Sequence, residues 1–335
     1  MKKVTLYLAI ALGLSAFAFW IYQQNKKSGT FNSKEFSVSD TASVSKIFLA
    51  DKKGNKVTLT RIKAGNWMVN DKFNVRNDAI NVLLKTFKLI EIKNPIAKSM
   101  HNNIIKDMAA RSVKVEIYTS DLDEPEKVYY VGGATQNTDG SFMLLQGSET
   151  PYVTYIPGFN GYLSTRYMVK EKEWRSAEIF NYSTISQVKS VSVDFVKAPA
   201  KSFKIDILNS NTFKLYSINP LKEVLSFDTL ALKDYLTAWK FVNFEAFEVV
   251  SQSEKDSTIA IGPEYIFTMY KSDGSKKEIK AFLKRPSLYA PQLDNRPKTK
   301  DVDRMYGLLP NEKDFVLIQY YTFDKLILGL DYFVK

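Results

Sequence analysis

The sequence predicts an α+β protein in which an N-terminal transmembrane helix precedes two related lobes of mostly antiparallel sheet, each with one long amphipathic helix packed on it. Three observations support this fold class. A long uncharged apolar run lies near the amino end of the 335-residue chain, short alternating strand patterns fill most of the rest, and one order of strands and helix occurs twice.

The apolar run Val4–Tyr22 carries no charge over 19 residues, and a membrane-spanning helix needs about 20. The alternative is a cleaved signal peptide, because Ala16-Phe17-Ala18 has the small-x-small pattern of a cleavage site. The run continues past that site through Ile21, which favours an uncleaved anchor over residues 1–27.

The flanking charges decide the expected orientation. Lys2 and Lys3 favour a cytoplasmic amino end, although Lys26 and Lys27 on the far side weaken that preference. We expect a single pass through the inner (cytoplasmic) membrane, contact with the lipid bilayer through the apolar run, and a body on the periplasmic, extracytoplasmic side. The serine-rich segment 28–43 is predicted to be a tether.

The first lobe is predicted over residues 44–180. The strand patterns VSKIFLAD, KVTLTRI and WMVN, separated by glycine-containing turns, begin it. A helix is predicted next, in AINVLLKTFKLIEI, because its apolar residues recur at steps of three and four. They are Ile80, Leu83, Leu84, Phe87 and Ile90. A small helical patch at Asn102–Ala110, four strand patterns and an aromatic segment complete the lobe.

The same order returns over residues 181–335. At an offset of 152 positions YLTAWK overlies LLKTFK, and FTMYKSD overlies VEIYTSD. Further on, SFMLLQG is aligned with DRMYGLL. We interpret the pattern as a tandem duplication. Because the apolar helix face persists with Trp239 in place of Phe87, each helix is predicted to pack on its own sheet.

The composition argues against several classes of function. The net charge is +11, from 47 basic and 36 acidic residues, but no run of five basic residues occurs. We therefore interpret the charge as a solvated surface and expect no nucleic-acid partner. The chain has no cysteine, so it has no disulfide, no thiol nucleophile and no cysteine-ligated zinc.

No catalytic residue, metal site or cofactor is predicted. The single histidine, His101, has no cysteine partners for zinc and no G-x-S-x-G elbow for a triad. The acidic Asp121–Glu126 lacks the spacing and the glycine of a calcium loop and is predicted to be a hairpin turn. Gly132-Gly133 is predicted to be a turn or bulge. A glycosidase-type pair of carboxylates stays open, because their separation is not visible in a sequence.

Contacts with other molecules are expected in aromatic and loop segments. The aromatic residues late in each lobe suit either the core or stacking on a sugar or a partner. They are Tyr152, Tyr155, Phe159, Tyr162 and Tyr167, and then Tyr320, Tyr321, Phe323, Tyr332 and Phe333. The proline-rich, basic stretch Leu283–Asp301 is predicted to be an inserted loop. The candidate interaction residues are Tyr162, Tyr167, Trp174, Arg285, Tyr289 and Arg296.

Several soft motifs carry a family resemblance: the hairpin end GNWMVN, the helix INVLLKTFKLIEI, and EWRSAEIFNYSTISQVKSVSV before the second copy. Their anchors are Gly65, Trp67, Leu83, Leu84, Trp174 and Arg175. Most of the stretch 44–335 thereby resembles the bacterial envelope family of the domain of unknown function 4340. Members of that family often accompany auxiliary components of gliding-type ABC transporters. The resemblance implies a location and an association, and it assigns no role to any residue.

These features together predict a non-enzymatic, membrane-anchored envelope protein. It would act as an interaction or accessory subunit of an ABC-transporter or gliding-type surface complex, with an envelope protein as its partner. A binding module for a cell-envelope glycan or other polymer is the alternative, and a hydrolase with an unidentified carboxylate pair is the third possibility.

Overall fold

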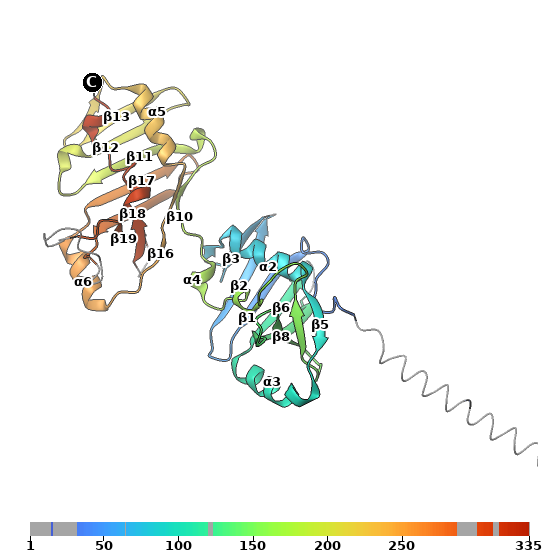
Figure 1. Ribbon diagram of the computed structural model, residues 1–335. Coiled ribbons are helices and arrows are strands. Elements are labelled where there is room, and N and C mark those ends of the chain that lie inside the picture. Colours follow the sequence, from blue (N-terminus) through green and yellow to red (C-terminus); the bar gives the residue numbers. More distant parts are fainter. Residues whose placement is uncertain are drawn as a thin grey trace, which may run out of the picture. The chain divides into compact units, whose positions relative to one another are not determined.

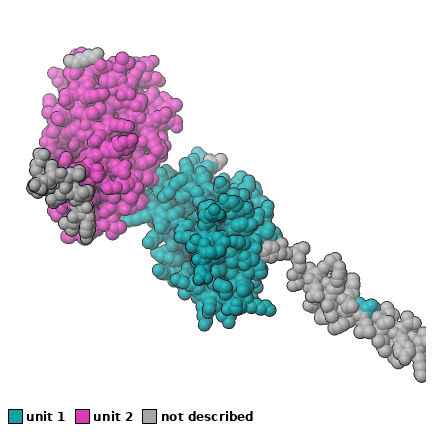
Figure 2. Space-filling model, in the orientation of Figure 1, with its two compact units in different colours: residues 1–176 teal, residues 177–335 magenta. Residues whose placement is uncertain are grey.

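The computed structural model describes residues 15, 32–63, 65–119, 123–286, 300–310 and 315–334. The chain divides into two compact units, unit 1 over Met1–Ser176 and unit 2 over Ala177–Lys335 (Figure 2). Each unit has a large antiparallel sheet and few helices, so the predicted α+β class is confirmed.

Unit 1 is built on a sheet of nine described strands, which run in the order β4-β3-β2-β1-β6-β7-β8-β9-β5 with every neighbouring pair antiparallel. The strands are β1 (Val44–Ala50), β2 (Lys56–Lys63), β3 (Asn66–Val69), β4 (Phe73–Asn74), β5 (Glu91–Pro95), β6 (Val113–Thr119), β7 (Lys127–Ala134), β8 (Ser141–Leu145) and β9 (Tyr152–Tyr155). The α-helices are α2 (Asn77–Leu89), α3 (Lys98–Arg111) and α4 (Glu171–Trp174).

The core of unit 1 lies between the sheet and α2 (Figure 1). Ile47 and Leu49 alternate along β1 and are fully buried. Helix α2 contributes Ile80, Leu83 and Phe87 to the same core, since residues three and four apart share one helix face. The prediction that this helix packs on its own sheet is confirmed.

The second helix, α3, is longer than the patch predicted at Asn102–Ala110 and packs on β7. A Cβ at Gly132 would lie 2.9 Å from Met108 Cγ, so the glycine allows the close approach of the helix. The register of β7 shifts by one residue between Val131 and Ala134, and the predicted bulge is confirmed. Among its described residues, unit 1 therefore has two long helices, whereas the sequence predicted one long helix and a small helical patch.

The segment 32–43 is part of unit 1 and does not behave as a tether. Phe36 and Val38 are buried in the core. The Val38 N–H donates to Phe87 O at 2.9 Å, which fixes the segment beside the end of α2. The sequence predicted a tether because the stretch is rich in serine, but its apolar residues Phe36 and Val38 pack in the core.

Unit 2 has nine described strands in the corresponding order, β14-β13-β12-β11-β17-β18-β19-β20-β16. They are β11 (Val188–Phe195), β12 (Phe203–Ile207), β13 (Phe213–Ile218), β14 (Leu221–Val224), β16 (Ala246–Phe247), β17 (Tyr265–Lys271), β18 (Lys276–Leu283), β19 (Arg304–Leu308) and β20 (Val316–Gln319). A separate two-stranded sheet pairs β10 (Glu178–Asn181) with β15 (Phe241–Asn243). The α-helices are α5 (Thr229–Ala238), α6 (Gln252–Ile261) and α7 (Tyr320–Phe323).

The two sheets agree in register as well as in strand order. In unit 1 Ile47 pairs with Ile117, and in unit 2 Val191 pairs with Met269. The first strand of each sheet has a register shift at the same place, after Val44 and after Val188. Helices α2 and α5 begin 152 residues apart, at Asn77 and Thr229, as the alignment predicted.

Two details of the predicted repeat are wrong. The units divide between Ser176 and Ala177, not after residue 180, because β10 pairs with β15 inside unit 2. The structural counterpart of Met143 is Gly307, whereas the sequence alignment had placed it on Met305. Met143 pairs with Val131 and Tyr152, and Gly307 occupies the same position between β18 and β20.

Within the described residues, the structure has no helix that is long and apolar enough to cross a membrane. The predicted span Val4–Tyr22 lies outside the described residues except for Ser15.

Candidate functional site

The predicted interaction residues fall into three groups. Tyr167 and Trp174 are buried in the core of unit 1. Tyr162 is 38% exposed, and Arg285 is exposed where β18 has ended. Tyr289 and Arg296 lie outside the described residues.

The buried pair closes the first unit. The Trp174 indole donates to Met168 O at 2.8 Å, and the Tyr129 and Tyr167 hydroxyls lie 3.2 Å apart. The Arg76 N–H donates to Trp174 O at 2.8 Å, which ties the end of unit 1 to the start of α2. Both rings therefore pack inside the core of unit 1. Burial raises the pKa of the Tyr167 hydroxyl.

The predicted inserted loop is present as an insertion in the repeat. Tyr129 corresponds to Ile279 and Met143 to Gly307, so the residue offset between the units rises from 150 to 164 across this connection. The base of the loop is fixed by Lys284, whose Nζ lies 3.2 Å from Asp301 Oδ2. Residues 287–299 lie outside the described part of the chain.

The described residues contain no group of three His, Asp or Glu side chains placed to hold a metal ion. His101 lies in the first turn of α3, where its Nε2 is 2.9 Å from Glu149 O. Asp194 and Glu278 interact on the polar face of the unit 2 sheet. Burial, and then the negative charge of Glu278, raise the pKa of the Asp194 carboxyl, while Glu278 forms an ion pair with Lys276 at 2.5 Å. This pair lines neither of the pockets described below.

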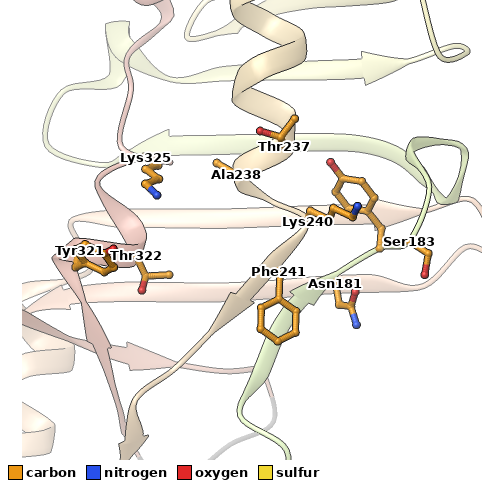
Figure 3. A pocket seen from close by; sticks show the side chains of 10 residues that line it. Asn181, Ser183, Thr237, Ala238, Lys240, Phe241, Tyr321, Thr322 and Lys325 are labelled. Carbon is orange, nitrogen blue, oxygen red and sulfur yellow. The ribbon is translucent and has the colours of Figure 1, made fainter.

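The larger pocket, of about 690 Å³, lies in unit 2 (Figure 3). Three segments surround it: the end of β10, the end of α5 with the start of β15, and α7 with the turn after it. The lining residues are Asn181, Tyr182, Ser183, Thr237, Ala238, Lys240, Phe241, Tyr321, Thr322 and Lys325. We call this the unit 2 pocket.

The wall of the unit 2 pocket is fixed by a buried tyrosine. Tyr182 is buried, and its hydroxyl donates to Leu236 O at 2.6 Å, which binds the chain after β10 to the last turn of α5. Burial raises the pKa of this hydroxyl, so Tyr182 stays neutral and structural. Behind it, the Phe180 and Trp239 rings pack with centroids 4.8 Å apart.

The accessible part of the lining is aromatic and basic. Phe241 is 68% exposed and Tyr321 is 82% exposed. Lys240 and Lys325 are exposed too, and neither forms an ion pair with a described residue. The Lys325 ammonium is 5.8 Å from the centroid of the Tyr321 ring. Among the described residues no Asp or Glu lines the pocket, so the lining suits a ligand with apolar groups and carboxylates.

The unit 2 pocket lies where the strand pairing of the second unit is shorter than that of the first. In unit 1, β5 pairs with β9 from Glu91 through to Pro95. In unit 2 only Ala246 and Phe247 pair with β20. The position equivalent to Glu91 is Asn243, which pairs with Glu178 of β10 on its other side but has no described partner on β20. The chain therefore parts from β20, and the pocket lies between β15 and α7.

A smaller pocket, of about 210 Å³, lies in unit 1 where α3 packs on the sheet. Its lining is mostly apolar, with Met108 and Leu144 among the lining residues and Lys52 and Tyr130 as polar members. It lacks the exposed aromatic rings and the paired lysines of the unit 2 pocket.

The sequence predicts only part of the unit 2 pocket. Tyr321 belongs to the aromatic cluster of the second lobe, whereas no feature of the sequence indicates a site at Lys240, Phe241 or Lys325. Phe241 follows directly after the apolar helix face that ends at Trp239. Nothing in the periodicity distinguishes an exposed ring at this position from another core residue.

The chain matches no family model, no curated protein and no solved structure.

Proposed function

We propose that the chain is a non-enzymatic, membrane-anchored protein of the cell envelope, and that its unit 2 pocket binds a partner protein. The observation that carries the proposal is the combination of two exposed aromatic rings, Phe241 and Tyr321, with two lysines and no acidic residue. Aromatic side chains and cations contribute a large share of the binding energy at protein interfaces.

The chemistry of the lining favours binding over catalysis. Ser183, Thr237, Thr322 and Asn181 contribute three hydroxyls and an amide to the lining, but among the described residues no carboxylate or imidazole lines the pocket to act as a general base. The two lysines supply positive charge for an anionic group, and the rings supply apolar area.

The location rests on the amino-terminal segment and on the family resemblance. Val4–Tyr22 is long and apolar enough to anchor the chain, with the lysines before it favouring a periplasmic body. The likeness to the envelope family of domain 4340 supports an accessory subunit of an ABC-transporter or gliding-type surface complex. The shared strand order and register of the two units support a tandem duplication, after which only unit 2 opened the pocket.

The test is co-purification of the full chain from detergent-solubilised membranes. We expect one envelope protein in stoichiometric amount with the wild type and its loss with the double variant Phe241→Ala, Tyr321→Ala. Tyr332→Ala is the matched control, because Tyr332 is 50% exposed and lies outside the pocket.

Two results would overturn this function. A partner retained equally by the double variant would show that the pocket is not the contact surface. Retention of the wild type on peptidoglycan, with no protein partner, would favour the glycan-binding alternative, in which the same rings stack on sugars.

A further inference from the structure

Phe241, which lines the unit 2 pocket, lies at the free edge of a strand that continues to Asn243. Strand β15 pairs with β10, and the Tyr182 N–H donates to Lys240 O at 3.3 Å while the Phe244 N–H donates to Ala177 O at 2.9 Å. Backbone groups alternate between the two sides of a strand. The backbone groups of Phe241 and Asn243 therefore point away from β10.

The side they face is the side that β20 occupies further along. The Glu245 N–H donates to Leu317 O at 2.7 Å, and Glu245 has the same parity as Phe241 and Asn243. Beyond Gln319, however, the chain turns into α7 and no longer runs as a strand. Among the described residues the sheet of β10 and β15 has just these two strands, so the Phe241–Asn243 edge has no strand partner.

Unit 1 shows what such an edge pairs with. Glu91, the equivalent of Asn243, pairs with Tyr155 of β9, whereas Leu89, the equivalent of Phe241, is the last residue of α2. Unit 2 replaces that pairing with a pocket of about 690 Å³, lined at one side by Lys240 and at the other by Lys325. A third strand laid in the pocket would pair with the free edge of β15 and bring its side chains to both lysines.

We propose that the partner enters the unit 2 pocket as an added β-strand: an extended, acidic peptide segment pairs with the backbone of Phe241 and Asn243, and its carboxylates bind Lys240 and Lys325. This inference rests on the proposed function, because it names how a protein partner would be held there. The rings of Phe241 and Tyr321 cover the apolar side chains that alternate with the carboxylates.

The probe is a library of random dodecapeptides, selected on the purified full chain and counter-selected on the variant Phe241→Ala, Tyr321→Ala. We expect the selected peptides to alternate acidic and apolar residues. Two N-methylated versions of each peptide are compared, one methylated at the odd positions and one at the even positions. One version should bind about tenfold more weakly and the other nearly normally, because only one set of N–H groups pairs with β15. In hydrogen exchange, the peptide should protect the amides of Phe241 and Asn243 more than those of Val242 and Phe244, which already face β10.

The possible results separate the two proposals. Strand addition is overturned if selected peptides bind the pocket equally well when either the odd or the even positions are N-methylated. It is also overturned if bound peptides leave the Phe241 and Asn243 amides unprotected from exchange. In both cases the pocket would remain a partner site. Basic selected peptides overturn the charge assignment and with it this inference. A selection that yields no pocket-dependent peptide contradicts the proposed function itself.

Discussion

Gln319 donates a side-chain hydrogen bond to Glu245 Oε2 at 3.1 Å, at the place where two strands of unit 2 part. Arg304 donates to both oxygens of the same carboxylate, at 2.7 and 2.9 Å, and its hydrogen bonds lower the pKa of Glu245. After Glu245 the chain forms β16, which pairs with β20. Before Glu245 it forms β15, which pairs with β10 and lies beside the unit 2 pocket. The Glu245 contact thus holds the base of the proposed binding site.

Reversal of the pocket charges should weaken partner binding. We expect the double variant Lys240→Glu, Lys325→Glu to lower the amount of co-purified partner protein about tenfold or more, because it places like charges against the expected carboxylates. Lys222→Glu, Lys280→Glu is the matched control, since both lysines are exposed and lie outside the pocket. Equal losses in the two variants would mean that net charge, and not the pocket, governs binding.

The two glycines of β7 should respond differently to alanine. A Cβ at Gly132 would lie 2.9 Å from Met108 Cγ and 3.1 Å from Phe142 O, while at Gly133 the nearest atom is 4.0 Å away. We expect Gly132→Ala to lower the free energy of unfolding by about 1–3 kcal/mol through overpacking. Gly133→Ala should change it by less than about 0.5 kcal/mol. Urea unfolding of both variants measures the difference, and equal effects would refute the close packing of α3.

Phe87, in the last turn of α2, and Trp239, the C-cap residue of α5, should carry much of the stability of their units. Phe87 and Trp239 are fully buried at equivalent positions. We expect Phe87→Ala or Trp239→Ala to cost about 3–5 kcal/mol of unfolding free energy. Leu230→Ala, on α5 but 77% exposed, should cost less than about 0.5 kcal/mol. Denaturant unfolding checks the three variants, and a small effect at Trp239 would contradict its place in the core.

Asp194 should make the folded protein less stable as the pH rises. Burial and the charge of Glu278 raise the pKa of its carboxyl in the folded state, so the folded chain binds this proton more tightly than the unfolded chain. The resulting stability is complete below the unfolded pKa and is lost as the pH rises through the folded pKa.

The variant Asp194→Asn isolates this effect. It should raise the Tm at pH 7, and the gain over the wild type should shrink as the pH falls through the folded pKa toward about 4, below which carboxyl and amide are both neutral. Asp234→Asn removes a charge from the exposed face of α5 and serves as the control. A gain that persists unchanged at low pH would show that the carboxyl does not titrate as its surroundings require.

Much of the fold follows from local pattern. The spacing of Ile80, Leu83 and Phe87 specifies one helix face, and the same face with Trp239 in the second unit identifies the repeat. Alternation in the strands predicts which side is buried, because side chains of a strand point alternately to its two faces. These are short-range signals that a sequence contains directly.

The site depends on a long-range difference that the sequence does not display. The unit 2 pocket lies where Asn243 has no described partner on β20, whereas its counterpart Glu91 pairs with Tyr155 of β9. Each stretch can be recognised as a short strand, but the composition of a strand does not identify the strand with which it pairs. Aromatic clusters mislead for a related reason: Tyr167 and Trp174 fill a core while Tyr321 is exposed, and only tertiary packing separates the two cases.

The most direct test of the central claim is photocrosslinking from the pocket in intact cells. A benzophenone amino acid placed at Phe241 should form an adduct with one envelope protein, and Lys240→Glu, Lys325→Glu in the same chain should abolish that adduct. The same amino acid placed at Tyr332, outside the pocket, should not form it. An identical adduct from both positions, or none from Phe241, would contradict a partner site in the unit 2 pocket.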